Sequence, residues 1–307
     1  MERSHVIALL VLGLVLGSFI ALTTSAPETA RWGARRVVAV VHLEGVLVAG
    51  QSGGGLLESY TGSEAVAEHL RTAAKDPEIG AVVLRINSPG GTAPAAQEIS
   101  AAVARLRQAG KPVVASMADM AASGGYWIAA QCDAIISNPA TLTGSIGVLM
   151  EVVNLQELYE TLGMDFETIT SGPYKDLGSA QRPLADDERA ILQSMVDDIF
   201  DQFVEAVAQG RQLDYAEVLA LADGRVVTGR QAEQLGLVDG QGDLDDAVAR
   251  AAQLAGLERY DVRTLRRPSP WSWLVGTVEG AGQWFILRGL PAYSWWGRQL
   301  VRLSGWE

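Results

Sequence analysis

The chain has 307 residues, of which 48% are hydrophobic and 20% charged, so it contains enough apolar material for one large core or two smaller ones. Its formal net charge of -12 argues against nucleic acid as a partner, because phosphate binding relies on clustered Lys and Arg. The single cysteine, Cys132, excludes an intrachain disulfide framework and a cysteine-based metal cluster, and its apolar surroundings predict a small core residue.

An uncharged apolar segment lies near the N-terminus, from Val6 to Pro27. As a helix of 22 residues it would cover about 33 Å, against a bilayer hydrocarbon core of about 30 Å. We therefore expect a single-pass transmembrane anchor over residues 1–27 and a linker over residues 28–36. A cleaved signal peptide ending at Ala26 is the alternative, which the length of the apolar run disfavours. The flanking arginines lie mainly after the segment, and this bias alone would place the following domain in the cytoplasm.

Between residues 37 and 172, β-branched apolar runs alternate with amphipathic stretches. Ser63 is expected to cap the first helix of this region. The alternation implies a parallel sheet with crossover helices. We predict strands over residues 37–48, 79–88, 111–118, 133–138 and 166–172, and helices near 62–76, 95–108 and 155–162, with a further helix after Ser123.

Residues 185–259 are predicted to be mainly helical. Asp186, Asp187 and Glu188 would occupy the first turn of a long helix, where carboxylates favour the positive end of the helix dipole. We interpret this helix and the shorter ones that follow as packing elements with no assigned chemistry. The shorter helices are expected near residues 215–222, 229–235 and 244–254.

The last forty residues differ in composition from the rest of the chain. Six of the eight tryptophans lie there, interleaved with arginines. Such a pattern suits a membrane interface, and packing on the domain or on a neighbouring subunit is an equal alternative. A second membrane span is not expected, because Pro291 and several charges interrupt the segment.

Three glycine-bearing loops follow predicted strands, with the sequences "INSPGGT", "AASGGYW" and "LTGSIGV". The carboxyl ends of parallel strands are where α/β sheets place their sites. If Ser123 begins a helix, the Gly124 N–H points outward with the positive end of the dipole. Together with the Gly91 N–H it could bracket a developing oxyanion, which is worth about 3 to 4 kcal/mol per donor. Taken alone, each glycine is explained more simply as a turn residue.

A serine nucleophile needs a proton acceptor, and the histidines are poorly placed for this role. His5 precedes the apolar N-terminal segment, His42 lies in a predicted strand, and His69 lies among charged residues of a predicted helix. We therefore expect a core position for His42 and a solvated helix face for His69. Carboxylates are abundant, but the pattern singles none of them out.

Lysine is rare in this chain, with only Lys75, Lys111 and Lys175 among its 24 Lys and Arg residues. The first two lie in turns before strands, as solubilising charges usually do, whereas Lys175 lies in a Gly/Pro/Ser loop after a predicted strand. A lysine base must be neutral, so burial must lower its pKa from about 10.4 to about 8, and arginine cannot be tuned in this way. The rarity of lysine and the loop position favour Lys175 as the base, and the alternative that it is an ordinary surface lysine stays open.

Five motifs together carry a family resemblance. In chain order they are "INSPGG", "MAASGGYWIAA", "NPATLTGSIGVL", "SGPYKDLGS" followed by "RPLADDER", and "DGRVVTGRQAEQLGLVD". From about Val37 to Ala255 the chain resembles the signal peptide peptidase A family of Ser/Lys proteases, in its short single-repeat bacterial form.

The resemblance implies an α/β fold of the Clp protease and crotonase type, with a parallel sheet and crossover helices, in addition to the N-terminal transmembrane helix. The peptidase domain would cover residues 37–265. The Trp-rich tail over residues 266–307 is not part of the family pattern.

The resemblance also implies residue roles. Ser123 would be the nucleophile, Lys175 the general base, Gly91 and Gly124 the oxyanion donors, and Ser145 a hydrogen-bond partner of the lysine. It implies no metal and no cofactor.

The family further implies a homo-oligomeric ring, taken here as an octamer, in which the adjacent protomer supplies Lys175. The implied substrates are hydrophobic peptides such as cleaved signal peptides. The implied location is the bacterial cell membrane, with the catalytic domain outside the cytoplasm, and here we follow the family over the weak charge bias.

Three other functions stay open. One is a related membrane Ser/Lys protease that acts on a particular membrane protein. Another is an acyl-CoA enzyme on the crotonase fold, which would polarise a thioester with loop N–H groups and give Ser123 no role. The third is a non-catalytic scaffold that keeps the ring. The predicted anchor and the intact Ser, Lys and Gly set favour the peptidase.

Overall fold

The computed structural model describes residues 36–54 and 59–265. The predicted anchor, all but the last residue of the predicted linker, and the Trp-rich tail lie outside these residues. Within the two described ranges, no helix is long and apolar enough to cross a membrane.

The described strands form two sheets. They are β1 (Arg36–Glu44), β2 (Val46–Val48), β3 (Gly53–Gly54), β4 (Ser59–Gly62), β5 (Ile79–Ser88), β6 (Val113–Ala122), β7 (Ala134–Ser137), β8 (Leu142–Gly144), β9 (Val226–Thr228), β10 (Gly240–Gln241) and β11 (Tyr260–Leu265). The main sheet has the order β10-β7-β6-β5-β1-β11, with β8 beside β6 and β9 beside β8; β2, β4 and β3 form the small sheet. In the main sheet every pair is parallel except β8 with β9, which confirms the predicted parallel α/β architecture.

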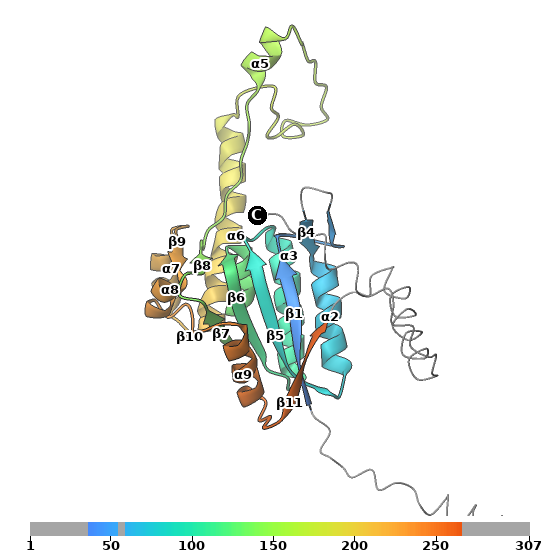
Figure 1. The fold of residues 1–307 in the computed structure, drawn as a ribbon. Coiled ribbons are helices and arrows are strands. Elements are labelled where there is room, and N and C mark those ends of the chain that lie inside the picture. Colours follow the sequence, from blue (N-terminus) through green and yellow to red (C-terminus); the bar gives the residue numbers. More distant parts are fainter. Residues whose placement is uncertain (1–35, 55–58, 266–307) are drawn as a thin grey trace, which may run out of the picture. The chain divides into compact units, whose positions relative to one another are not determined.

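Helices cover both faces of the main sheet. The described helices are α2 (Ser63–Lys75), α3 (Ala93–Gln108), α4 (Gly124–Ala130), α5 (Gln156–Thr161), α6 (Asp186–Arg211), α7 (Tyr215–Leu221), α8 (Gly229–Gln234) and α9 (Leu244–Leu254). Figure 1 shows α2 and α3 on one face and α9 on the other. The predicted positions of α3, α5, α7, α8 and α9 are confirmed to within a few residues.

Strand β1 shows why the sheet is buried on both faces. Its residues Ala39, Val41 and Leu43 pack into the larger core with α2, α3 and α4, while Val38 and Val40 pack against α9. Because the sheet is covered on both faces, the strand reads as an almost continuous apolar run rather than an alternating one.

Strand β6 has two neighbours on one side. Its first half, Val114 to Met117, pairs with β7, and its last residues, Met120 to Ala122, pair with β8. On the other side lies β5, with a register shift between Ile86 and Ser88. The carboxyl ends of β5, β6 and β8 therefore meet at the same end of the sheet, and each of the three glycine-bearing loops begins there.

Two sequence-based predictions of local structure are wrong. Residues 166–172 form no strand; all but Gly172 are exposed, and the stretch pairs with no strand among the described residues. Ser63 does not cap α2, because Gly62 is the N-cap and Ser63 is a buried first residue. Its hydroxyl accepts a hydrogen bond from the Gly50 N–H at 3.1 Å and donates one to Glu98.

Two other residues, Lys111 and Cys132, have structural roles. The Lys111 ammonium donates to the carbonyls of Ala73 and Asp76, both at 2.6 Å, so it closes the C-terminal end of α2 rather than only solubilising a turn. Cys132 is buried as predicted, and burial raises the pKa of its thiol to about 12, which keeps it unreactive.

Candidate active site

Ser123 stands between the carboxyl end of β6 and the start of α4, and this confirms the prediction that it begins a helix. Its backbone adopts φ 50° and ψ -122°, a region that residues with a side chain rarely enter. Two hydrogen bonds hold it there: the Ser123 N–H donates to the Gly144 carbonyl, and the Trp127 N–H donates to the Ser123 carbonyl, both at 2.9 Å. A strained serine at a strand-to-helix turn presents its hydroxyl beyond the sheet, as nucleophile elbows do.

Helix α4 is buried over its whole length and is fixed by side-chain contacts. The Trp127 ring stacks on the Phe203 ring of α6, with centroids 4.6 Å apart and an interplanar angle of 16°. The Tyr126 hydroxyl donates to the Leu237 carbonyl at 2.9 Å. The serine at the head of this helix therefore sits on a rigid base.

The loop after β5 approaches Ser123 so closely that only glycine fits. A Cβ atom on Gly90 would lie 2.8 Å from the Ser123 Cβ, and one on Gly91 would lie 2.1 Å from the Leu47 carbonyl oxygen. The loop is held by β2: the Leu47 N–H donates to the Gly90 carbonyl at 2.8 Å, and the Thr92 N–H donates to the Leu47 carbonyl at 3.0 Å.

The two predicted oxyanion donors lie side by side. A Cβ atom on Gly124 would be 3.4 Å from the Gly91 nitrogen. Among the described residues, the Gly91 N–H has no hydrogen-bond acceptor, and Gly124 is the first residue of α4, whose N–H has no partner within its own helix. This pair can receive a developing negative charge beside the Ser123 hydroxyl, and its role stays a prediction.

Ser145 reaches the same region from β8. It has φ 52°, and its N–H donates to the Arg225 carbonyl at 2.8 Å. Its side chain is half-buried and borders the same cavity as Ser123. Four of the five predicted site residues, Ser123, Gly91, Gly124 and Ser145, are thus brought together.

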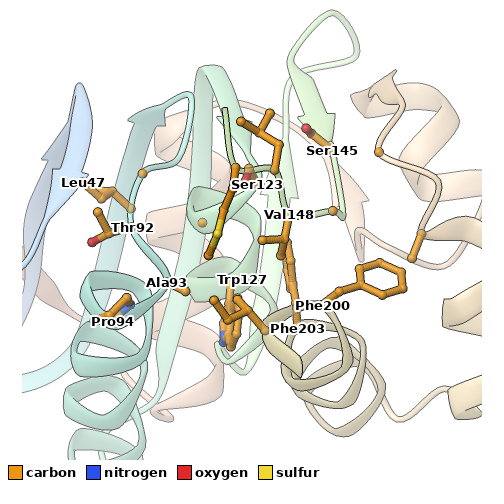
Figure 2. Close-up of a pocket in the computed structure, with 18 of the residues that line it drawn as sticks. Leu47, Thr92, Ala93, Pro94, Ser123, Trp127, Ser145, Val148, Phe200 and Phe203 are labelled. Atoms are coloured by element: carbon orange, nitrogen blue, oxygen red, sulfur yellow. The ribbon is translucent and has the colours of Figure 1, made fainter. Parts of the chain in front are cut away.

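The cavity has a volume of about 850 Å³ and two apolar walls. Figure 2 shows Ser123 between them, with Leu47 on one side and Phe200 and Phe203 on the other. Such a channel can accept an extended peptide and bury its apolar side chains next to the serine. The walls consist of Val46, Leu47 and Val48 on one side and Trp127, Val148, Leu149, Met150, Ile199, Phe200 and Phe203 on the other.

Lys175 lies elsewhere. It belongs to a segment between β8 and α6, here called the arm (residues 151–185), which projects past the carboxyl end of the sheet in Figure 1. Lys175 is exposed in a turn, where its N–H donates to the Gly172 carbonyl at 3.3 Å. Among the described residues of this chain, it is not one of those that line the Ser123 cavity.

Sequence reasoning missed the contribution of α6 to the cavity. Ile199, Phe200 and Phe203 of this helix line the wall opposite Leu47, although the helix was interpreted as packing alone. The signal was present in the sequence, since the apolar residues Val196, Ile199, Phe200 and Phe203 recur at helical spacing. What the sequence could not tell is which part of that stripe meets the core and which part meets the cavity.

Comparison with known proteins decides the family. Residues 105–258 match the model of Peptidase family S49, which is half of the chain. The chain belongs to peptidase family S49. The predicted family and the predicted enzyme class, a serine peptidase, are thereby confirmed.

Individual relatives agree. A protease-named protein of Synechocystis sp. is 44% identical over 209 residues, which are 67% of this chain and 75% of that protein. Protease 4 of Salmonella typhi is 37% identical over 223 residues, which are 73% of this chain and 35% of that protein. A protein of Enterococcus faecium that bears the name signal peptide peptidase SppA is 38% identical over 179 residues, 58% of this chain and 52% of that protein. The match thus covers about a third of the Salmonella protein and half of the Enterococcus one.

Proposed function

We propose that the chain is a serine endopeptidase of the Clp protease and crotonase fold type, with Ser123 and Lys175 as its catalytic dyad. The observation that carries the proposal is the strained Ser123 in one cavity with the paired nitrogens of Gly91 and Gly124. Strain of this kind costs about 1 to 3 kcal/mol, persists only where the surrounding structure enforces it, and clusters at active sites.

The reaction follows the usual order of acyl transfer. The Ser123 Oγ attacks the scissile carbonyl carbon while neutral Lys175 takes the hydroxyl proton. The Gly91 and Gly124 N–H groups hold the oxyanion, and the lysine returns its proton to the leaving amine. Lys175 then takes a proton from water, which attacks the acyl-enzyme, and it returns that proton to the Ser123 Oγ as the acyl–Oγ bond breaks. In this scheme Ser145 holds the lysine by a hydrogen bond.

The position of Lys175 supports a site shared between chains. The lysine is exposed on the arm, and the arm carries many exposed apolar side chains, with none of α5 buried. Exposed apolar surface of this extent is typical of an interface. A ring, which we take as an octamer, would cover the arm and bring Lys175 of one protomer to the Ser123 cavity of the next. The arm's exposed apolar side chains are Val153, Leu158, Leu162, Met164, Phe166, Ile169 and Tyr174.

The cavity walls support hydrophobic peptides as substrates, including cleaved signal peptides, whose central part is an apolar run. The apolar segment Val6 to Pro27 supports a membrane anchor close to such substrates. We place the catalytic domain on the extracytoplasmic side of the bacterial membrane, where signal peptides are released.

The test uses three variants of the full chain. Ser123→Ala and Lys175→Ala should each lower kcat/KM for an apolar peptide by about 10³-fold or more, and Lys75→Ala, an exposed lysine at the end of α2, should leave it unchanged. A serine-directed phosphonate should label the wild type and not Ser123→Ala. Wild-type activity in Lys175→Ala would refute the dyad.

Mixing tests the shared site. Ser123→Ala and Lys175→Ala chains co-assembled from unfolded or separated protomers should regain activity, because some interfaces then combine an intact serine with an intact lysine. A site built within one chain predicts no recovery.

A further inference from the structure

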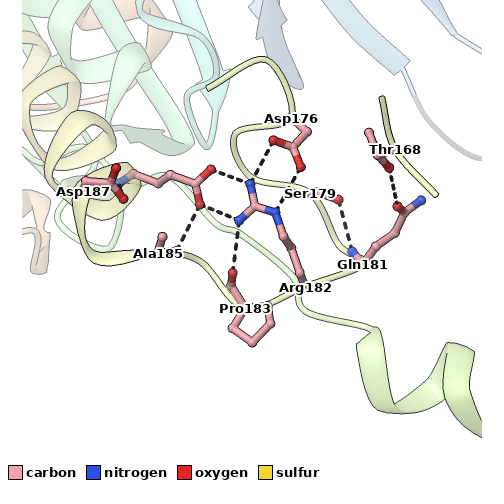
Figure 3. Close-up of polar contacts among 9 residues, drawn as sticks. Thr168, Asp176, Ser179, Gln181, Arg182, Pro183, Ala185 and Asp187 are labelled. Atoms are coloured by element: carbon pink, nitrogen blue, oxygen red, sulfur yellow. Dashed lines mark hydrogen bonds and ion pairs between the residues drawn. The ribbon is translucent and has the colours of Figure 1, made fainter. Parts of the chain in front are cut away.

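The loop that carries Lys175 is tied to the first turn of α6 by one arginine. The Arg182 guanidinium makes two hydrogen bonds to the Asp176 carboxylate, both at 3.0 Å, and two to the Glu188 carboxylate, at 2.7 and 2.6 Å. Figure 3 shows the Arg182 guanidinium facing the Asp176 carboxylate. Two forked contacts of this kind fix both the position and the plane of the guanidinium.

The contact between Arg182 and Glu188 at the start of α6 is rigid. Glu188 is 2% exposed, and its carboxylate also accepts the Ala185 N–H at 3.0 Å, closing the first turn of the helix. The guanidinium of Arg182, together with that N–H, holds the pKa of Glu188 down at about 2. Glu188 is therefore a fixed, charged acceptor at neutral pH, and Arg182 is its obligatory partner because a buried carboxylate cannot stay unpaired cheaply.

The other end of the contact is the residue next to Lys175. Arg182 binds both oxygens of Asp176, which directly follows the lysine, and lowers the pKa of that carboxyl. On the other side of the lysine, the Asp187 carboxylate interacts with the Tyr174 hydroxyl and raises the pKa of the tyrosine. Both neighbours of Lys175 are thus held by side chains that lead to the start of α6, and the lysine between them is exposed.

Charge gives this contact a second consequence. Asp176 is the carboxylate closest to Lys175 in the sequence, and an opposite charge within about 4 to 6 Å favours the charged form of a lysine. A charged lysine cannot accept the serine proton. The Arg182 guanidinium offsets the negative charge of Asp176 and fixes the position of its carboxylate, so this carboxylate attracts the Lys175 ammonium less than an unpaired one would.

We propose that Arg182 is a positioning residue of the peptidase, which holds the Lys175 loop on the first turn of α6 and keeps the Asp176 carboxylate away from the lysine. The inference rests on the proposed function, because it assigns Arg182 to the delivery of the general base. It also gives a role to the "RPLADDER" motif, which begins with this arginine.

The charged and titratable groups around Arg182 are few. Asp176 comes from the loop, Glu188 and Asp187 come from α6, and Tyr174 precedes Lys175 in the loop. Glu151 borders the same surface hollow as Arg182. Arg189 of α6 borders the same surface hollow as Arg182, is exposed, and makes no side-chain ion pair within the described part of the chain. It offers a control with the same change of charge.

The experiment compares Arg182→Gln with Arg189→Gln in the full-length assembly, using kcat, KM and the pH dependence of kcat/KM. Arg182→Gln should lower kcat about tenfold or more with KM within about twofold, because the walls of the Ser123 cavity are untouched. The midpoint of the acid side of its pH profile should rise by about one pH unit, because Asp176 becomes free to pair with the lysine. Arg189→Gln should match the wild type in all three quantities.

Second-site variants separate positioning from simple loss of structure. Asp176→Asn in the Arg182→Gln background should return the midpoint to its wild-type value while kcat stays low. Arg182→Lys should restore only part of kcat, since an ammonium cannot make two forked contacts. If Arg182→Gln does not assemble, Asp176→Asn alone carries the test, with lowered kcat and an unmoved midpoint expected.

Three results would overturn the inference: wild-type kcat in Arg182→Gln, a loss of kcat with no change of midpoint, or a midpoint that stays raised in the double variant. The Lys175→Ala variant shows separately whether the proposed Ser123–Lys175 dyad is wrong. Wild-type activity in Lys175→Ala removes the proposed function whatever Arg182 does, whereas an inactive Lys175→Ala beside a fully active Arg182→Gln removes only the role of Arg182.

Discussion

The two halves of the proposed dyad are held in opposite ways. Ser123 is fixed by backbone hydrogen bonds, close glycine contacts and a buried aromatic stack at the end of the sheet. Lys175 is exposed on the arm, where polar side chains hold its loop and α5 has no buried residue. The surroundings of Ser123 are formed by one chain, whereas Lys175 lies on an exposed surface. This contrast fits a site that is completed when chains assemble.

The largest expected difference between the two halves comes from substituting a glycine in each, beginning with Gly91. In Gly91→Ala the new Cβ would meet the Leu47 carbonyl at 2.1 Å, so the loop must move and the Gly91 N–H leaves the cavity. We expect kcat/KM to fall on the order of 100-fold or more. Gly163→Ala in the arm is the matched control: it also has positive φ, but nothing lies within 4 Å of its Cβ. It should cost about 1 kcal/mol of local strain and leave kcat/KM within about threefold. Equal losses in the two variants would contradict the contrast.

One aromatic pair lies beside Ser123 and another lies in the arm, and the loss of each should lower the free energy of unfolding by a different amount. Trp127 stacks on Phe203 in the core, while Tyr159 meets Phe166 edge to face in the arm, at 4.9 Å and 67°. Trp127→Ala should lower the free energy of unfolding by about 3 to 5 kcal/mol. Tyr159→Ala should lower it by about 1 kcal/mol or less, because Phe166 is 45% exposed. Urea titration followed by circular dichroism gives both values, and a larger loss for Tyr159→Ala would show that the arm is packed in solution more tightly than in one chain.

The exposed apolar residues of the arm allow assembly to be separated from folding. Ile169 is 91% exposed, so Ile169→Ser should change the stability of a single chain by no more than about 0.5 kcal/mol. We expect it to weaken the oligomer, measured as mass by light scattering at several concentrations, and to lower activity in proportion. Val262→Ser on β11, 55% exposed and outside the arm, is the control that should leave the mass unchanged.

The smallest expected effect is the response of the arm to acid. The pKa of Glu188 is lowered to about 2 in the folded chain, from about 4.3 for a free glutamate. The stabilisation that this carboxylate gives is therefore complete above about pH 4.3 and is lost as the pH falls through about 2. Pepsin cleavage within the arm should rise over this window before cleavage of the sheet does. In Glu188→Gln the arm should be cleaved readily at the upper end of the window as well, and an unchanged pH dependence in that variant would assign the effect to another carboxyl.

The serine half could be predicted from sequence because its signals are local. Glycines in "SPGG" and "SGGYW" follow apolar strands, and in a parallel sheet the ends of such strands meet. The positive φ of Ser123 was not predicted, since it depends on hydrogen bonds to Gly144 and Trp127 that form only in the folded chain. The helix start was visible, but its strain was not.

The lysine half was predicted only in part, because its structure depends on contacts between distant or exposed residues. Residues 166–172 are β-branched enough to suggest a strand, yet they pair with no strand in the part of the chain that the structure describes. Strand β11 was missed for the opposite reason: "YDVRTL" is a polar edge strand, and its pairing with β1 supplies what the side-chain pattern does not show. Lys175 was singled out by rarity, a criterion that carries no information about distance from Ser123.

Helix α6 has one further consequence. Glu188 in its first turn anchors the lysine loop, and Phe200 on the same helix lines the serine cavity. Twelve residues separate them, which at 1.5 Å per residue is about 18 Å along the helix axis. The helix therefore fixes the distance between the attachment point of the lysine loop at Glu188 and the cavity wall at Phe200. Inserting or deleting one residue between Glu188 and Phe200 would rotate Glu188 by about 100° around the helix axis relative to Phe200. Only changes close to whole helical turns would keep both residues on their present sides of the helix.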